Sequence, residues 1–532
     1  MIGDRQPMAN EKLAGGGAVA LSALAFFLAF VGAWLRPVWH DELYTLSLAR
    51  LPVGELLSAL VVDSGPPLHY LLCHLLFVLV GWPEGSFVGT LMVRMPSVVA
   101  YSILPLVASR GLPIGSRGLP WAAVLTISWL PLFYFGTEAR AYALLALVNA
   151  VAWIRGPEWI ERGGPRIVAF GAAAACLPVF HYMGVASFVA LPALALFVSS
   201  QRRRALAVTL ATAALPALIW SPVMLGSPSS SMGWLDTAAG PGRPGWSTLS
   251  VLAPAGPFPA LFEFSEPPVA AWLSLASLVL LVAGAVVGMR VLGKRLASES
   301  KEVAAVIRLG IGLLPAVGLA LAGLAGVPLY FAGRTESMVW TLGATMAAVA
   351  MLGMGRSARA VAGGVYALIG VVTIVMWLAE LPSRPQGVGV EIGYELASRS
   401  EQGDRIVVAG LWQLEVQHGL AEANLGQPQK PPVKVETIPK SQSDHPGWLD
   451  RRILSSPKLL EDEARALRDA SDRDLSRIWL VWSPGLPLES GLFPVFSGWQ
   501  RARVMSSPMI AVDLLVPPPH EISPRRDGEL RK

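Results

Sequence analysis

Apolar runs of about 18 or more residues recur along this chain of 532 residues, from residue 13 to residue 380. A helix of that length crosses the ~30 Å hydrocarbon core of a bilayer and satisfies its own backbone hydrogen bonds. Charged residues make up only 15% of the chain, against about 25% in soluble globular domains. The sequence therefore predicts a polytopic α-helical membrane protein.

The distribution of basic residues predicts the orientation of the chain. Arg5 and Lys12 precede a first span at 13–35, so the N-terminus is expected in the cytoplasm. The next apolar segment, 67–82, is marginal for crossing because it is only about 15 residues long. If it crossed, the Arg-rich loops that follow would all lie outside. The positive-inside rule favours a half-inserted or re-entrant helix instead.

About eleven spans are expected in all, and the residues between the first two form an outer loop over 36–87. That loop is expected to carry amphipathic surface helices at 41–50 and 53–62. Residues 226–267, rich in Pro, Gly, Ser and Trp, predict another outer loop. The ten spans after the first are expected at 88–109, 119–136, 139–155, 166–182, 183–200, 204–225, 268–292, 309–330, 337–355 and 359–381.

The composition changes after residue 381, where short strand and helix patterns alternate. We expect a small extracytoplasmic α/β domain over 382–516, after a transmembrane domain over 1–381, and a disordered tail over 517–532. The strands of the α/β domain are expected at 404–410, 433–438, 477–482 and 510–516, and its helices at 412–425 and 458–470.

The expected topology gathers ionisable residues from five distant segments on the outer face. Such groups cost about 2.5–3.5 kcal/mol each near a membrane-helix centre, and persist mainly where they serve a site or find a partner. The catalytic candidates are Asp41 and Glu42. The substrate-binding candidates are Asp63, His69, Arg94, Glu138, Arg140, Tyr142, His181 and Arg334. Guanidinium groups suit a phosphate, and a carboxylate can accept a proton.

Each of these residues also has a purely structural interpretation. Asp41 is a preferred N-cap for a surface helix, Glu138 and Arg140 can form an interfacial ion pair, and Arg94 can snorkel to headgroups. No metal site is assigned, although a divalent cation beside Asp41 and Glu42 stays open. No nucleotide-binding motif occurs, and a net charge of +5 carried in short inter-span loops does not indicate a nucleic-acid partner.

Five motifs stand in a fixed order in the first part of the chain. They are Trp39-His40-Asp41-Glu42, Asp63-Ser-Gly-Pro66-Pro67-Leu-His-Tyr70, Arg94-Met-Pro-Ser97, Thr137-Glu138-Ala-Arg140-Ala-Tyr142-Ala-Leu-Leu and His181-Tyr182. Together they resemble the GT-C glycosyltransferases, and most closely the protein mannosyltransferase and aminoarabinose transferase-like group. The resemblance covers roughly residues 13–200 and is weak from 226 onward. Family members often carry His or Lys where this chain has Gly65, so His69 is a candidate replacement.

The resemblance implies a polyprenyl-phosphate-sugar donor and an acceptor hydroxyl on a protein, lipid or envelope glycan. Transfer would take place at the extracytoplasmic face of the inner (plasma) membrane, with the lipid bilayer as a further partner. Asp41 would act as general base with Glu42 as its companion. The lipid-linked phosphate would be held by Arg94, Arg140 and Arg334.

A lipid or polysaccharide transporter or flippase is the main alternative. Transporters usually show paired halves, with interrupted helices and polar groups near the midplane. In this chain the polar residues gather at one face, and no matching halves are visible. A third interpretation is an assembly scaffold whose C-terminal domain binds a partner, for which Asp41→Asn would be harmless.

Overall fold

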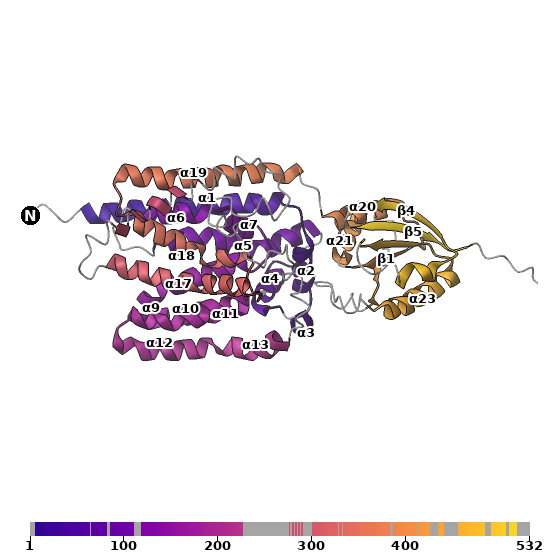
Figure 1. The fold of residues 1–532 in the computed structure, drawn as a ribbon, viewed down its shortest axis with the longest axis horizontal. Coiled ribbons are helices and arrows are strands. Elements are labelled where there is room, and N and C mark those ends of the chain that lie inside the picture. Colours follow the sequence, from indigo (N-terminus) through magenta and orange to yellow (C-terminus); the bar gives the residue numbers. More distant parts are fainter. Residues whose placement is uncertain are drawn as a thin grey trace, which may run out of the picture. The chain divides into compact units, whose positions relative to one another are not determined.

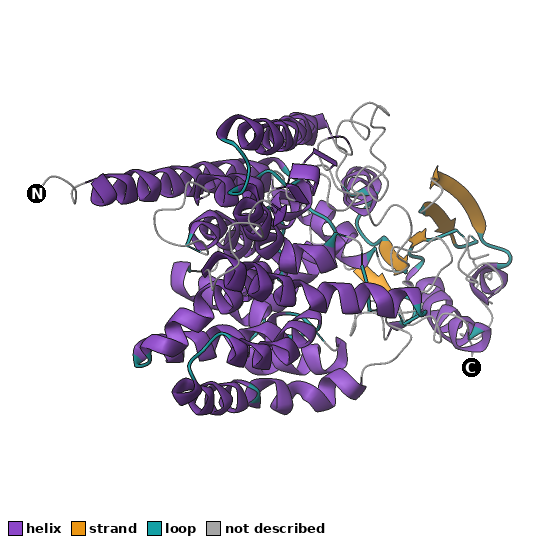
Figure 2. Cartoon of the chain, turned by 60° about the vertical axis from the view of Figure 1, so that its left-hand side comes forward, coloured by secondary structure: helices purple, strands orange, loops and turns teal. Residues whose placement is uncertain are grey.

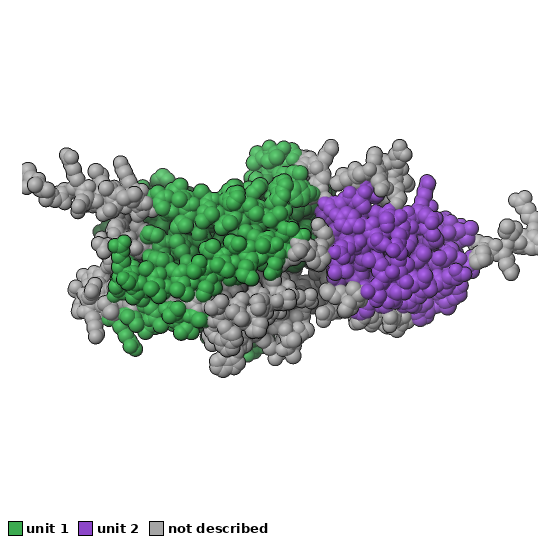
Figure 3. Space-filling view, turned by 90° about the horizontal axis from the view of Figure 1, so that it is seen from above, with its two compact units in different colours: residues 1–384 green, residues 385–532 purple. Residues whose placement is uncertain are grey.

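The computed structural model divides into two compact units, Met1–Arg384 and Pro385–Lys532 (Figure 3). The described elements of unit 1 are all helices, and the described strands all lie in unit 2 together with further helices (Figure 2). Beyond Gly226, the expected loop lies outside the described residues, as do most of the expected span 268–292 and the tail from residue 519. The structure describes residues 6–63, 65–81, 86–110, 119–226, isolated positions between 276 and 290, 301–327, 329–331, 333–383, 387–410, 412–425, 435–440, 456–484, 491–506 and 510–518.

Five helices in the described part of unit 1 are long and apolar enough to cross a membrane. Several of them run nearly parallel in Figure 1, and many of their outward side chains are exposed and apolar, as lipid contact requires. They are α1 (Gln6–Leu35), α5 (Ser86–Ser109), the continuous pair α12 (Ser200–Ala213) and α13 (Leu215–Gly226), α17 (Lys301–Leu324) and α19 (Arg356–Glu380).

The expected count of eleven spans is not confirmed, because several expected spans consist of shorter pieces. The expected span 119–136 is two helices, and 139–155 starts as an α-helix and ends as a π-helix. The shorter elements are α6 (Leu119–Ile127), α7 (Leu130–Gly136), α8 (Tyr142–Ala150), π-helix η1 (Val151–Arg155), α9 (Gly156–Arg162), α10 (Pro165–Phe180), α11 (Met183–Ala190), η2 (Leu191–Leu196), α18 (Arg334–Met351) and η4 (Leu381–Ser383).

The break between α6 and α7 packs directly against α19. Trp129, the residue before α7, is extended, and its ring stacks on Trp340 of α18 with the centroids 4.5 Å apart. Gly370 of α19 lies against the carbonyl of Ser128, so that a Cβ at this glycine would sit 1.9 Å from the oxygen. The interruption is therefore fixed by tertiary contacts from two distant helices.

Three short helices lie near the end of unit 1 at which α1 ends (Figure 1). They are α2 (His40–Ala49), α3 (Val53–Asp63) and α4 (Pro67–Val80). The bounds of the first two match the expected helices at 41–50 and 53–62 closely, although most residues of α2 are buried. With 14 residues, α4 is about 21 Å long, well short of the ~30 Å hydrocarbon core. This length fits a half-inserted helix.

Unit 2 contains a five-stranded sheet in the order β2-β1-β3-β5-β4. The central strand β3 pairs in parallel with β1, where Val407 lies opposite Leu480. It pairs antiparallel with β5, where Leu480 lies opposite Asp513. The elements are α20 (Val388–Arg399), β1 (Arg405–Ala409), α21 (Gln413–Leu425), β2 (Val435–Thr437), α23 (Pro457–Asp474), β3 (Ile478–Trp482), η6 (Phe493–Phe496), β4 (Gln500–Ser506) and β5 (Ala511–Val516).

Three elements of unit 2, α20, η6 and β4, were absent from the sequence expectations. Glycines interrupt the apolar pattern of α20, and they allow its backbone to touch α21. A Cβ on Gly393 would lie 2.5 Å from the Val416 carbonyl oxygen, and one on Gly419 would lie 2.2 Å from that of Val390. β4 is an edge strand with mostly exposed residues, so its sequence lacks the usual alternation.

Candidate functional site

The turn between α7 and α8 is held in place by side chains from two other helices. The Ala139 N–H donates to Glu42 Oε1 over 2.9 Å. The Ala139 carbonyl oxygen accepts hydrogen bonds from Thr45 Oγ1 and His69 Nε2, each over 3.1 Å. Because this peptide is fixed by α2 and α4, the two residues beside Ala139 project their side chains from a well-defined backbone.

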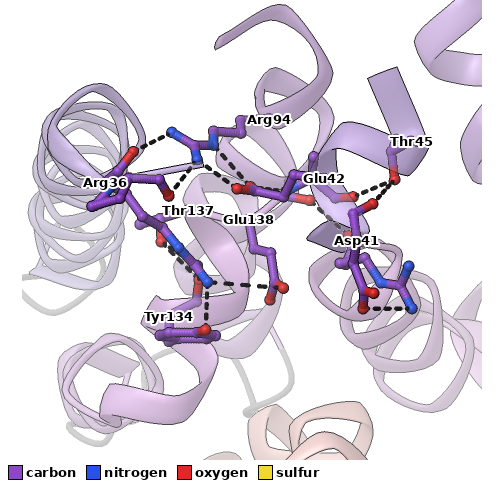
Figure 4. A network of polar contacts seen from close by, with 12 residues as sticks. Arg36, Asp41, Glu42, Thr45, Arg94, Tyr134, Thr137 and Glu138 are labelled. Atoms are coloured by element: carbon purple, nitrogen blue, oxygen red, sulfur yellow. Dashed lines mark hydrogen bonds and ion pairs between the residues drawn. The ribbon is translucent and has the colours of Figure 1, made fainter. Parts of the chain in front are cut away.

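Arg94 of α5 is completely engaged by protein acceptors (Figure 4). Its Nε and Nη2 donate to the two oxygens of Glu42 over 2.8 and 2.5 Å. The remaining bonds reach the carbonyl oxygens of Ala33, Arg36 and Pro37 over 2.6, 2.9 and 3.1 Å. A guanidinium group has five N–H donors, so none remains for a phosphate.

Glu42 is the buried partner of this fork. Burial by itself would raise the pKa of Glu42, but the charge and hydrogen bonds of Arg94 outweigh it and hold the pKa below its ordinary value. The ionised carboxylate therefore links the segment after α1 to α5 and to the α7–α8 turn. Both side chains are almost fully buried, so this pair supports the site without facing a substrate.

Asp41 lies beside Glu42 but has a different environment. Its Oδ2 is 3.4 Å from Arg140 Nη2, and the two side chains are 24% and 21% exposed. Burial would raise the pKa of Asp41, whereas the positive charges of Arg140 and Arg334 lower it and prevail. Trp39 occupies the N-cap position of α2 without a side-chain cap. Asp41 is thus an ionised carboxylate in the first turn, partly open to solvent.

Arg334 approaches the same region from the start of α18. Its guanidinium carbon lies 5.2 Å from the centre of the Tyr142 ring and 4.1 Å from that of Phe331. The Tyr142 ring in turn lies 5.0 Å from the His181 ring. The Arg334 side chain makes no hydrogen bond or ion pair within the part of the chain that the structure describes. It is therefore a cation positioned by aromatic rings.

Two residues that the sequence interpretation missed, Arg36 and Tyr134, complete the network. Arg36 Nη2 donates to the Tyr134 hydroxyl and lies 3.9 Å from Glu138 Oε1. Its Nη1 donates to the Tyr134 carbonyl oxygen and to Thr137 Oγ1, each over 3.4 Å. Arg36 directly follows the first apolar run, so its position carried the same signal that singled out Asp41.

The structure brings six of the ten candidates into one electrostatic cluster, and three others support it. Glu42, Arg94 and His69 bind protein groups. Asp63 ends α3, and its side chain lies outside the described residues. The described residues contain no group of three or more His, Cys, Asp or Glu side chains that could hold a metal ion. The six are Asp41, Glu138, Arg140, Tyr142, His181 and Arg334.

No protein-family model and no curated protein matches the chain. Among solved structures, the crystal structure of ArnT from Cupriavidus metallidurans bound to undecaprenyl phosphate is similar, with a TM-score of 0.53 and 12% identity over 94% of this chain and 98% of that chain. The apo crystal structure of the same protein has a TM-score of 0.43 and 13% identity over the same shares. The chain therefore shares its fold with ArnT.

Proposed function

We propose that this protein is a membrane glycosyltransferase that moves a sugar from a polyprenyl-phosphate-linked donor to an acceptor hydroxyl on the extracytoplasmic face. The proposal rests on the surroundings of the Asp41 carboxylate. It forms an ion pair with the guanidinium group of Arg140, and the charge of Arg334 also acts on it. The shared fold supports it, since ArnT was crystallised with undecaprenyl phosphate, a lipid of the donor's class.

Arg140 and Arg334 are the residues that would bind the donor phosphate. The donor is a phosphodiester with one negative charge, and its leaving group is a phosphate monoester that gains a second charge as the sugar departs. Fixed cations bind that developing charge more strongly than the ground state, which lowers the barrier. Arg94 is not assigned this role, because all its N–H donors are already used.

Asp41 would act on the acceptor as general base. Its carboxylate is ionised and partly exposed, so it can accept the hydrogen bond of an incoming hydroxyl while the oxygen attacks the anomeric carbon. A positioned base of this kind contributes about 10²–10⁴ in rate. A single displacement would invert the anomeric configuration. Glu42 would hold the first turn of α2, which carries Asp41.

Mass spectrometry of envelope glycans and glycoproteins tests this function in the host cell. Cells without the protein should lack one sugar modification, and the wild-type gene should restore it. Asp41→Asn should fail to restore it although the protein is made and folded. Glu158→Gln, which removes a carboxylate paired with Arg155 and Arg162 in α9, should restore it as the wild type does.

Full restoration by Asp41→Asn would contradict the proposed mechanism. A different pattern would favour the transporter alternative: the lipid-linked sugar would accumulate on the cytoplasmic side of cells without the protein. In that case membrane vesicles with the wild-type protein would move the lipid across the bilayer and leave its sugar attached.

A further inference from the structure

Glu138 carries a buried carboxyl group that has no hydrogen-bond partner among the described residues. Its side chain is 1% exposed, and neither Oε1 nor Oε2 receives a donor. Arg36 Nη2 lies 3.9 Å from Oε1, which is too far for a hydrogen bond. A charged carboxylate is poorly stabilised in such surroundings, so uptake of a proton is favoured.

The cations around Glu138 are occupied or distant. Arg36 donates hydrogen bonds to Tyr134 and Thr137. Arg94 donates hydrogen bonds to Glu42 and to backbone oxygens. Burial outweighs the cations and raises the pKa of Glu138 to about 7. The charged and titratable groups that face it are Arg36 after α1, Glu42 in α2, Tyr134 in α7, Arg140 in its own turn and Arg334 in α18.

Asp41 differs from Glu138 in each of these respects. It is partly exposed, it pairs with Arg140, and its pKa lies below the ordinary value. Arg140 and Arg334 act on both carboxyl groups, so the two belong to one electrostatic environment. Figure 4 shows Glu138 with Arg36 and Tyr134 on one side and Asp41 on the other. Two carboxyl groups whose pKa values are shifted in opposite directions commonly divide acid and base roles between them.

We propose that Glu138 is the residue that finally holds the proton released by the acceptor hydroxyl, after Asp41 has accepted it in transit. This inference rests on the proposed transferase function and assigns a role within the same site. Asp41 is held ionised by Arg140, so it is suited to orienting the hydroxyl and poorly suited to keeping the proton. Glu138, buried and without a hydrogen-bond partner among the described residues, is suited to keeping it.

The transfer step balances with these two carboxylates. The O–H bond of the acceptor breaks, and its oxygen forms a bond to the anomeric carbon. The bond between that carbon and the phosphate oxygen breaks, and the phosphate leaves with the electron pair between Arg140 and Arg334. The proton passes through Asp41 to Glu138. Its later release to water restores the starting state.

The pH dependence of transfer tests the inference. We would supply the full-length protein, in vesicles of host membrane, with a panel of undecaprenyl-phosphate-linked hexoses and pentoses. Since Glu138 must be unprotonated to receive the proton, the wild-type rate should fall below about pH 7. Glu138→Gln should lower the rate at alkaline pH by roughly 10²–10⁴ and abolish this decline. Glu138→Asp should keep a decline in the acid range.

Glu158→Gln in α9 is the matched control, and its rate and pH profile should equal those of the wild type. A Glu138→Gln variant with the wild-type rate and pH profile would overturn the inference and leave the transferase function intact. A wild-type protein that transfers no sugar at any pH, with every donor of the panel, would instead refute the proposed function.

Infrared spectroscopy tests the proton on Glu138 without any donor. A protonated carboxylic acid has a C=O stretching band that an ionised carboxylate lacks. The wild type should show a band that disappears as the pH rises through about 7, and Glu138→Gln should lack that titrating band. A titrating band that is unchanged in Glu138→Gln would belong to another residue and would overturn the inference.

Thermal unfolding shows whether Glu138→Gln folds, and it has its own expected pH dependence. The pKa of Glu138 rises from 4.5 to about 7 because of burial, so the folded state binds the proton more tightly than the unfolded state. The wild type therefore loses stability as the pH rises through this window. Relative to the wild type, the Tm of Glu138→Gln should increase over the same window and level off above it.

Discussion

Arg94 shows at the scale of one residue how the site is supported. Its fork binds both oxygens of Glu42, and its other donors bind one carbonyl oxygen in the last turn of α1 and two just after the helix. A planar guanidinium group can serve five acceptors at once, whereas the ammonium group of lysine has only three donors. The position of Asp41, one residue before Glu42, depends on this fork.

Arg94→Lys keeps the positive charge but leaves buried acceptors unsatisfied. We expect a loss of about 1–3 kcal/mol in the free energy of unfolding, together with a loss of transfer activity, because the first turn of α2, which carries Asp41, is released. Chemical unfolding in detergent measures the first effect. Arg155→Lys, at a partly exposed ion pair with Glu158, should change stability little. Equal effects of the two substitutions would argue against the supporting role of Arg94.

The sequence indicated which residues lie together at the candidate site better than it indicated their contacts. Asp41 was identifiable because a carboxylate directly after an apolar run is unusual. The pairing of Arg36 with Glu138 was not identifiable, because the two lie about a hundred positions apart and meet only where the end of α1 contacts α7 and the turn after it. The burial that separates the proton affinities of Asp41 and Glu138 is likewise a property of the fold.

At the scale of elements, helix ends near the surface were predictable and helix interruptions were not. The bounds of α2 and α3 follow from local apolar spacing and Pro52. The break between α6 and α7 depends on Gly370 in α19, more than two hundred residues away. An apolar segment that is continuous in the sequence can therefore form two helices when a distant helix packs against its backbone.

Gly370→Ala tests the contact that fixes this break. Its Cβ would lie 1.9 Å from the Ser128 oxygen, so α19 must move away. We expect a loss of about 1–3 kcal/mol in stability, measured by chemical unfolding. Gly318→Ala in α17 is the matched control, because nothing lies within 4 Å of the new Cβ. That control should be neutral or stabilise the helix by about 0.5–1 kcal/mol. Equal stability of the two variants would contradict the packing.

At the scale of the whole molecule, five described helices can cross a bilayer, and the basic loops should lie on the cytoplasmic side. That orientation would place α2, the α7–α8 turn and the start of α18 on the extracytoplasmic side together. The same fold then provides an apolar surface for a lipid tail and a charged end for its phosphate. The sidedness of the chain is inferred from the charges of the loops, because the packing of the helices does not determine which side is cytoplasmic.

Single cysteines test the orientation in a background without Cys73 and Cys176. Glu55→Cys in α3 should react with a membrane-impermeant thiol reagent added from outside the cell. Arg162→Cys in α9, at a side chain that is 52% exposed, should react only after the membrane is permeabilised. Reaction of both cysteines from outside would mean that α4 crosses the membrane, because α9 follows α4 and Glu55 precedes it. The reverse labelling pattern would mean that the whole chain has the opposite orientation.

The most direct test of the central claim measures cleavage of the donor. The full-length protein in vesicles of host membrane would receive undecaprenyl-phosphate-linked hexoses and pentoses, and mass spectrometry would follow free undecaprenyl phosphate and newly glycosylated acceptor together. We expect one donor to yield both products with the wild type and neither with Asp41→Asn. Intact donor throughout, or equal product from Asp41→Asn, would contradict a transferase that works through Asp41.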